Sequence, residues 1–433
     1  MRIILAATPA TGHLNPILAA ARVLVAQGHE VALTTASAFR AKVEATGARF
    51  VPLPPGADMD LSDTAGLFPE RANLQPGLPQ LAFDFKHFFI DPIPAQFAGL
   101  ERLLADFPAD AILADTMFGG CLPFLLGARA RRPAIATLGV SSLLTRRRDR
   151  APVGMGLPPA SDEITVIRYA NMAAEVNMVL LDPLRLQVDA VLKALGAQSL
   201  PMPYIEALVG LPDLFLQPSV PAFDFPCMEL PPNLHFIGAL PTSPGEPLPA
   251  DLAAAIGAGR RVVLVTQGTV ANHDLGQLIG PTVQALAGRD DVLLLIATGG
   301  RPLEAIPHPL PANALAAAFL PFDALMPHLD LFVTNGGHGG VTQAVTHGVP
   351  LVTAGTSEDK REVNARVGWS GVGLDLRTDA PSVAQLRDAI ASVLDDPAYR
   401  RRAQAMAQAF AGYDAATLLC DLLEQTVRAH PVS

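Results

Sequence analysis

The sequence Leu331-FVTNGGHGGVTQAVTHGVPLVT-Ala354 decides the fold of this chain. Its first part, 331–334, is an apolar run of strand type, and four glycines follow within 336–340. Residues 341–346 have helical spacing, Gly348-Val349-Pro350 ends that helix, and 351–354 predict another strand. The order strand, glycine-rich turn, helix, strand predicts a parallel α/β unit. The helix N-terminus of such a unit offers free backbone N–H groups to a phosphate, and glycines let the anion approach closely.

The N-terminus predicts a second unit of the same kind. Residues 3–7 form an apolar strand, 8–13 a loop, and 15–27 a helix with Pro16 in its first turn. After the proline-dense stretch Leu240–Pro249, the apolar run from Arg261 repeats the pattern of residues 2–8. We therefore expect an α/β chain with two doubly wound, Rossmann-like domains, over 1–239 and 251–410, joined by a linker at 240–250.

Composition narrows the classes of function. Half of the 433 residues are hydrophobic, 17% are charged, and the net charge is −10, which argues against nucleic acid or an anionic membrane as the partner. Three separated cysteines (Cys121, Cys227 and Cys420), with no signal peptide or spanning segment, indicate a soluble cytoplasmic protein, monomeric or homodimeric, without stable membrane insertion. The run Arg146-Arg147-Arg148 is interpreted as a solvated face in preference to an anion site.

Further residues around the glycine-rich turn carry a family resemblance. In order they are Phe319-Leu320-Pro321, Thr334-Asn335-Gly336-Gly337, Gln343, Gly348-Val349-Pro350 and Asp359-Lys360. Over about fifty residues this order and spacing resembles the donor-binding signature of family 1 glycosyltransferases. These have the GT-B fold and include plant UDP-glycosyltransferases and bacterial macrolide-type glycosyltransferases. The resemblance implies two domains facing across a cleft, with a last helix, at 411–433, returning to the N-terminal domain. It also implies transfer of a sugar from a nucleotide sugar, without another cofactor.

The resemblance implies a donor-binding set in the second half. Its members are Gly268, Thr269, Phe319, Pro321, Asn335, Gly337, His338, Gly339, Gly340, Gln343, Asp359 and Lys360. Several depart from the family pattern: Asn335 replaces a histidine, Phe319 a tryptophan, and Gln343 the glutamate that accepts ribose hydroxyls. Asp359 matches the residue that accepts hydrogen bonds from the sugar, whereas Lys360 replaces a glutamine. Because of these exchanges, the sequence does not decide which sugar is bound, or whether the nucleotide is UDP or dTDP. The alternative interpretations are that Asp359 favours a helix start and that Lys360 pairs with a neighbouring carboxylate.

His13 and Asp115 are the predicted catalytic pair. His13 follows the first strand and Asp115 follows the apolar run 111–114, so both emerge at the carboxyl edge of one sheet. Neutral imidazole suits removal of a hydroxyl proton near pH 7, and a carboxylate fixes its tautomer. A loop histidine is also typical of structural positions; the resemblance favours the catalytic interpretation. Asp110 precedes the same strand and is expected at the wrong edge.

The acceptor pocket is expected in the first half, beneath the proline- and glycine-rich loop 54–94. Its phenylalanines either cover an apolar ligand or pack on their own domain; with Ser141, the candidates are Phe83, Phe85 and Phe88. Asp58-Met59-Asp60 is interpreted as a solvated acidic loop, and the histidines lack ligand spacing, so no metal is predicted. The alternatives to an inverting transfer to an apolar small molecule are a glycolipid transferase and a non-catalytic nucleotide-sugar binder. A dinucleotide oxidoreductase would need G-x-G-x-x-G after the first strand.

Overall fold

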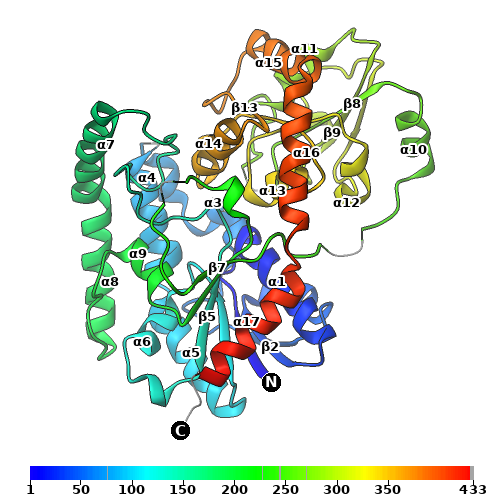
Figure 1. Ribbon diagram of the computed structural model, residues 1–433. Helices are drawn as coiled ribbons and strands as arrows, with labels where there is room; N and C mark the ends of the chain where they lie inside the picture. Colours follow the sequence, from blue (N-terminus) through cyan, green and yellow to red (C-terminus); the bar gives the residue numbers. More distant parts are fainter. Residues whose placement is uncertain (76, 227, 243–244, 270, 430–433) are drawn as a thin grey trace.

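Two parallel β-sheets with helices on both faces make up the two halves of the molecule, in a computed structural model that describes residues 1–75, 77–226, 228–242, 245–269 and 271–429 (Figure 1). This confirms the predicted α/β fold with two doubly wound halves. Cys227, residues 243–244 of the expected linker, and residues 430–433 of the expected last segment lie outside the described ranges.

The first sheet has seven strands in the order β3-β2-β1-β4-β5-β6-β7. β1 pairs in parallel with β2 on one side and β4 on the other, so the strand order reverses between β1 and β4. Such a reversal leaves a crevice at the carboxyl ends of the two strands. The strands are β1 Arg2–Ala6, β2 Glu30–Thr35, β3 Arg49–Pro52, β4 Ala111–Asp115, β5 Ala134–Leu138, β6 Leu214–Gln217 and β7 Leu234–Phe236.

The second sheet has six strands in the order β10-β9-β8-β11-β12-β13. β8 pairs with β9 and with β11, so this sheet reverses its order between β8 and β11, as the first does between β1 and β4. The strands are β8 Arg261–Thr266, β9 Val292–Ala297, β10 Ala314–Ala317, β11 Leu331–Thr334, β12 Leu351–Thr353 and β13 Gly373–Asp375. The repeated apolar runs therefore do mark two similar units.

Helices cover both faces of each sheet, which is why central strands such as β1 and β9 are almost entirely apolar instead of alternating with polar residues. Leu5 packs in one cluster with Leu24 of α1, while its neighbour Ile4 packs in another with Leu100 of α5. The helices of the first half are α1 Thr11–Ala26, α2 Arg40–Glu44, α3 Thr64–Leu67, α4 Leu78–Asp84, α5 Ile93–Asp106, α6 Leu122–Leu125, α7 Glu163–Val176, α8 Asp182–Ala194 and α9 Tyr204–Gly210. Those that follow are α10 Ala250–Ile256, α11 Ile279–Leu286, α12 Phe322–Leu325, α13 His338–Thr346, α14 Lys360–Ser370, α15 Val383–Asp395, α16 Pro397–Ala411 and α17 Ala415–Ala429.

The chain ends by returning from the second half to the first. α16 packs on α13 of the second half, and α17 packs on α1, β5 and β6 of the first (Figure 1). Leu419 and Leu423 of α17 are fully buried in the cluster that contains Leu5. The expected C-terminal helix on the N-terminal half is confirmed. Within the described ranges, none of the helices combines the length and the apolar character needed to cross a membrane.

Two local predictions were wrong. α1 begins at Thr11 instead of Asn15, because the carbonyl of Ala10 already accepts bonds from the N–H groups of His13 and Leu14, and the helix accommodates Pro16 inside. Residues 54–94 are not one loop but a series of short helices, including a π-helical turn at Phe85–Ile90. Prolines lie in the first turns of several of them, where the missing N–H costs nothing.

Candidate active site

The reversal point of the first sheet brings His13 and Asp115 together. His13 lies in the first turn of α1, which follows β1 after a short loop, and Asp115 is the last residue of β4. Nδ1 of His13 lies 2.8 Å from Oδ1 of Asp115. The histidine side chain is 18% exposed and the aspartate side chain is fully buried. The buried carboxylate thus holds the imidazole by Nδ1, while part of the ring stays accessible to solvent.

The surroundings of Asp115 fix the hydrogen on the imidazole. The backbone N–H of Thr8 donates to Oδ2 at 2.5 Å, while the Thr8 hydroxyl and the N–H of Met117 donate to Oδ1 at 3.2 and 2.9 Å. A carboxylate only accepts, so Nδ1 of His13 is the donor, and in the neutral imidazole the lone pair is on Nε2. Sequence reasoning missed Thr8, although it lies in the loop that follows β1 and so at the same edge.

An aromatic cluster lies beside the imidazole. The ring of Phe89 is 5.6 Å from that of His13, and Phe85 and Phe88 lie 5.7 and 6.2 Å from Phe89. Phe83, also predicted, packs further out on Phe68. The rings therefore pack on one another and form an apolar wall next to His13. Phe89 is one of the phenylalanines of residues 54–94 but was not among the predicted candidates. Its ring is the one beside His13.

The reversal point of the second sheet gathers the loops that follow β8 and β11. Gly268 takes a left-handed conformation with φ +69°, and Thr269 beside it is exposed. Asn335 follows β11, and its Nδ2 donates to the carbonyl of Gln267 at 2.5 Å. Asn335 belongs to the predicted donor-binding set; in the structure an N–H of its amide ties the two loops together.

The turn before α13 depends on glycine. Gly336 has φ +92°, and a Cβ there would lie 1.7 Å from Oδ1 of Asn364. Gly337 is the N-cap, and α13 starts at His338, so Gly339 and Gly340 already belong to its first turn. This start is three residues earlier than predicted. The first backbone N–H groups of a helix have no partner within it, so this end can bind an anion.

The surroundings of His338 at this helix end disfavour its charged form. Burial lowers its pKa below the ordinary value, the charge of Arg366 lowers it further, and the carboxylate of Asp359 offsets part of the effect. The positive end of the α13 dipole acts in the same direction as burial. His338 and Asp359, both in the predicted donor set, are therefore close enough to interact electrostatically.

Phe319 has an exposed ring, whereas the side-chain amide of Gln343 is already hydrogen-bonded within the protein. Phe319 follows β10 with 68% of its surface exposed, next to Gly300, as a ring that stacks on a base would be. Pro321 is the N-cap of the short helix α12. Nε2 of Gln343 donates to Oδ1 of Asp323, so its amide oxygen remains for a hydroxyl while its N–H is occupied. The partner of Gln343 was not predicted.

Asp359 and Lys360 lie at the start of α14, but their side chains have different partners. Oδ2 of Asp359 accepts a 2.5 Å hydrogen bond from the hydroxyl of Ser141, which follows β5 of the first sheet. Ser141, predicted to bind the acceptor, thus lies on a donor-site candidate. Lys360 is buried, pairs with Glu358, and lines a small cavity with Gln267, Asn335, Ser357 and Asp379. The carboxyl edges of the two sheets meet at the Ser141–Asp359 contact.

Comparison with known proteins identifies the family to which this chain belongs. Residues 284–422 match the family described as Erythromycin biosynthesis protein CIII-like, C-terminal domain. 4'-Demethylrebeccamycin synthase of Lentzea aerocolonigenes is 39% identical over 428 residues, which are 98% of this chain and 99% of that protein. This chain is a family 1 glycosyltransferase.

Two further comparisons agree with this assignment. UDP-glycosyltransferase 2 of Phaeomoniella chlamydospora is 35% identical over 441 residues, covering 99% of this chain and 96% of that protein. The crystal structure of CalG4, the calicheamicin glycosyltransferase, superimposes with a TM-score of 0.73 at 21% identity, over 99% of this glycosyltransferase and 98% of that chain. At that identity the structural likeness shows the GT-B fold alone.

The remaining predictions for this glycosyltransferase had mixed outcomes. Asp110 accepts a hydrogen bond from the N–H of Arg2 at the start of β1, so it does lie at the opposite edge of the sheet from His13. The prediction that residues 146–148 form a solvated face is wrong for Arg147. Its side chain is buried and donates to both carboxylate oxygens of Asp149. A carboxylate two residues away allows that guanidinium to be buried. Asp58, half-buried, accepts bonds from the N–H and hydroxyl of Ser37.

Proposed function

We propose that this glycosyltransferase moves a sugar from a UDP- or dTDP-sugar to a hydroxyl group of an apolar small molecule, with inversion at the anomeric carbon. The observation that carries the proposal is the His13–Asp115 pair, 2.8 Å apart at the reversal point of the first sheet. Its co-substrate is a nucleotide sugar. The names of the relatives, a natural-product synthase and a UDP-glycosyltransferase, support the same chemistry.

His13 acts as the general base in this proposal. Nε2 takes the proton of the acceptor hydroxyl as its oxygen attacks the anomeric carbon from the face opposite the diphosphate. Asp115 accepts the Nδ1–H and stabilises the imidazolium that forms. Because three donors from Thr8 and Met117 already hold Asp115, the carboxylate has no other orientation to adopt.

The second half receives the leaving group. When the bond between the anomeric carbon and the diphosphate oxygen breaks, its electron pair stays on the diphosphate. The N–H groups at the start of α13 and the loop at Gly268 and Thr269 are oriented before that charge develops, which lowers the barrier. Phe319 stacks on the base, the amide oxygen of Gln343 accepts a ribose hydroxyl, and Asp359 accepts hydroxyls of the sugar.

The first half binds the acceptor. In this assignment residues 1–239 form the acceptor domain and 251–410 the donor domain, joined at 240–250. The phenylalanine rings beside His13 present an apolar wall to a hydrophobic acceptor, so that its hydroxyl is delivered to Nε2 without a polar competitor.

The test is sugar transfer by the wild type and by His13→Ala. UDP-glucose and dTDP-glucose are supplied with a panel of hydroxylated aromatic and macrolide-type aglycones, and products are identified by mass spectrometry, with the anomeric configuration read by NMR. We expect a β-glycoside from the α-configured donor, and loss of turnover in His13→Ala with calorimetric affinity for UDP or dTDP unchanged. Nucleotide binding without transfer to any aglycone would indicate a non-catalytic binder. Retention of turnover by His13→Ala would exclude this base.

A further inference from the structure

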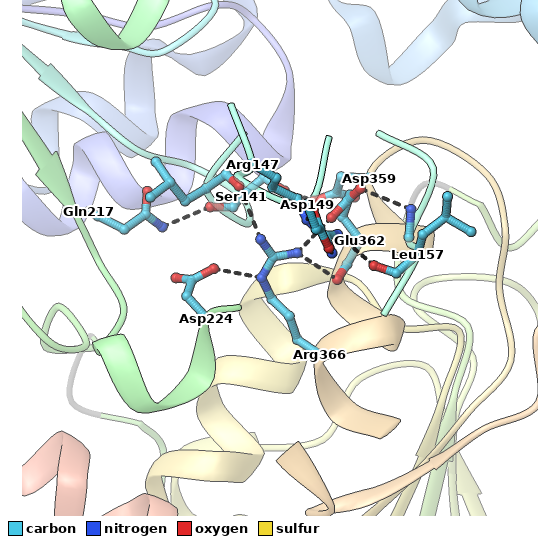
Figure 2. A network of polar contacts seen from close by, with 11 residues as sticks. Ser141, Arg147, Asp149, Leu157, Gln217, Asp224, Asp359, Glu362 and Arg366 are labelled. Carbon is cyan, nitrogen blue, oxygen red and sulfur yellow. Dashed lines mark hydrogen bonds and ion pairs between the residues drawn. The ribbon is translucent and has the colours of Figure 1, made fainter. Parts of the chain in front are cut away.

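A buried network joins the two halves beside Asp359. Figure 2 shows Arg366 of α14 at its centre, reaching from the second half to groups of the first. Nε of Arg366 lies 2.6 Å from Oδ1 of Asp224, Nη2 donates to the carbonyl of Leu143 at 3.0 Å, and Nη1 lies 2.7 Å from Oε2 of Glu362. The guanidinium is 1% exposed, so water does not compete for these bonds.

The planar geometry of a guanidinium allows little variation in where its partners lie. Its donors form a rigid planar fork, so Arg366 sets the position of both first-half groups at once. Its face also lies 4.4 Å from the centre of the Phe225 ring, and the guanidinium of Arg147 lies 4.5 Å from the same ring. α14 is thereby fixed against two first-half segments, one ending at Leu143 and one at Phe225.

A second contact docks the start of α14. The N–H of Gly156 donates to Oε1 of Glu362 at 2.9 Å, and Gly156 has φ +60°. A Cβ at this position would lie 2.3 Å from the carbonyl oxygen of Arg361, so the approach is open to glycine alone. Two first-half segments, at Leu143 and at Gly156, therefore meet the first two turns of one second-half helix.

Ser141 is where this docking reaches the site. It lies two residues before Leu143, and its carbonyl accepts a 2.9 Å bond from Nε2 of Gln217, at the end of β6. Its hydroxyl donates to Oδ2 of Asp359 at 2.5 Å (Figure 2). Asp359 immediately precedes α14. The segment 141–143 is thus held by Gln217 at one end and Arg366 at the other, with the Ser141 hydroxyl aimed at the carboxylate.

We propose that Ser141, held by the Arg366 network, is a positioning residue for Asp359, so that the sugar part of the donor is read by both halves of the protein. This inference rests on the proposed role of Asp359 as the acceptor of hydrogen bonds from the sugar. With Oδ2 of Asp359 held by Ser141, the rotation of the carboxylate is restricted, and Oδ1 is left to accept hydrogen bonds from the sugar. Recognition of the sugar then depends on the contact between the halves, whereas recognition of the nucleotide, at Phe319 and Gln343, does not.

The test compares UDP with UDP-glucose by calorimetry in the wild type, Ser141→Ala and Ser142→Ala. Ser142 is the matched control because its buried hydroxyl has no hydrogen-bond partner among the residues that the structure describes. We expect the affinity for UDP to be the same in all three proteins, and the additional affinity for UDP-glucose to fall about tenfold in Ser141→Ala alone. A merely structural role for Ser141 would change both affinities together.

A double-mutant cycle with Asp359→Ala completes the test. Because Ser141 acts through Asp359, Ser141→Ala should add nothing once Asp359 is removed. If Ser141→Ala keeps or increases the additional affinity for UDP-glucose, the positioning role is wrong while the proposed function stands. If the wild type binds neither UDP nor UDP-glucose, nor the corresponding dTDP ligands, the proposed function fails and this inference with it.

Discussion

The imidazole Nδ1 of His13 lies 2.8 Å from Oδ1 of Asp115, although 102 residues separate them in the chain. Their proximity follows from the pairing of β1 with β4, in which Ala6 is opposite Ala114. One residue after that pair comes Asp115, and the first turn of α1 brings His13 back over the same edge. The position of the pair is therefore a property of the sheet order.

Asp115→Asn should lower kcat by about two to four orders of magnitude. The amide keeps the shape of the side chain but supplies an N–H where Nδ1 needs an acceptor, so the imidazole loses its tautomer and its partner in the charged state. Nucleotide affinity should not change. Steady-state kinetics with calorimetry of UDP binding measures both quantities.

Asp110→Asn is the matched control for that variant. Asp110 lies one residue before β4, accepts a bond from the N–H of Arg2, and is at the opposite edge of the sheet from His13. We expect its kcat to equal that of the wild type. An equal loss in both variants would mean that the effect of Asp115→Asn is a general loss of structure.

Arg366→Met should reduce the free energy of unfolding by about 3–5 kcal/mol, because it leaves Asp224 and Glu362 as buried carboxylates without their cation. Burial already raises the pKa of Asp224 above its ordinary value even with Arg366 in place. Urea denaturation measures the change. Arg289→Met, which breaks an exposed pair with Asp291, should cost less than about 1 kcal/mol. Similar losses in the two variants would contradict the buried network.

Gly156→Ala should lower the free energy of unfolding by about 2–4 kcal/mol, from left-handed strain together with the overlap between Cβ and the carbonyl of Arg361. Gly154→Ala separates the two contributions. Gly154 has φ +86°, and no atom of the described part of the chain lies within 4 Å of its Cβ position, so that variant should cost about 1–2 kcal/mol, the strain alone. Equal costs in thermal or urea unfolding would mean that the segment at Gly156 is not packed on α14 in solution.

His338 should make stability decrease as the pH falls below 6.5, its ordinary pKa. Burial lowers the pKa of His338 in the folded protein, so between the folded and unfolded values the unfolded chain binds the extra proton. The stability linked to the neutral form is therefore complete above pH 6.5 and is lost on acidification toward the folded pKa.

The measurement is urea denaturation of the wild type and His338→Gln from pH 8 to pH 5. Other histidines titrate in both proteins, so their effects cancel in the difference between the two free energies of unfolding. That difference should shift in favour of His338→Gln as the pH falls. A difference that does not vary with pH would show that His338 titrates normally in the folded protein.

The sequence by itself determined the sheets and the edge at which the site lies. Apolar runs such as 262–265 and 331–333 are covered on both faces, so they are recognisable without knowledge of what covers them. Gly336 before α13 indicated the tight turn at the helix start, because its φ of +92° is a backbone conformation that few other residues adopt. His13 and Asp115 were predictable as neighbours because residues following parallel strands share one edge.

Only the tertiary structure decided which partners the polar side chains take. Asn335 donates to Gln267, Gln343 to Asp323, and Ser141 to Asp359, and these partners are 68, 20 and 218 residues away. The run Arg146-Arg147-Arg148 is typical of a solvated surface, yet the guanidinium of Arg147 is buried, as is that of Arg366 where the two halves meet. Hydrophobic periodicity records whether a face is buried, since that is a local property of a helix or strand. The identity of a buried polar group's partner depends on how distant segments are brought together, and no local pattern encodes it.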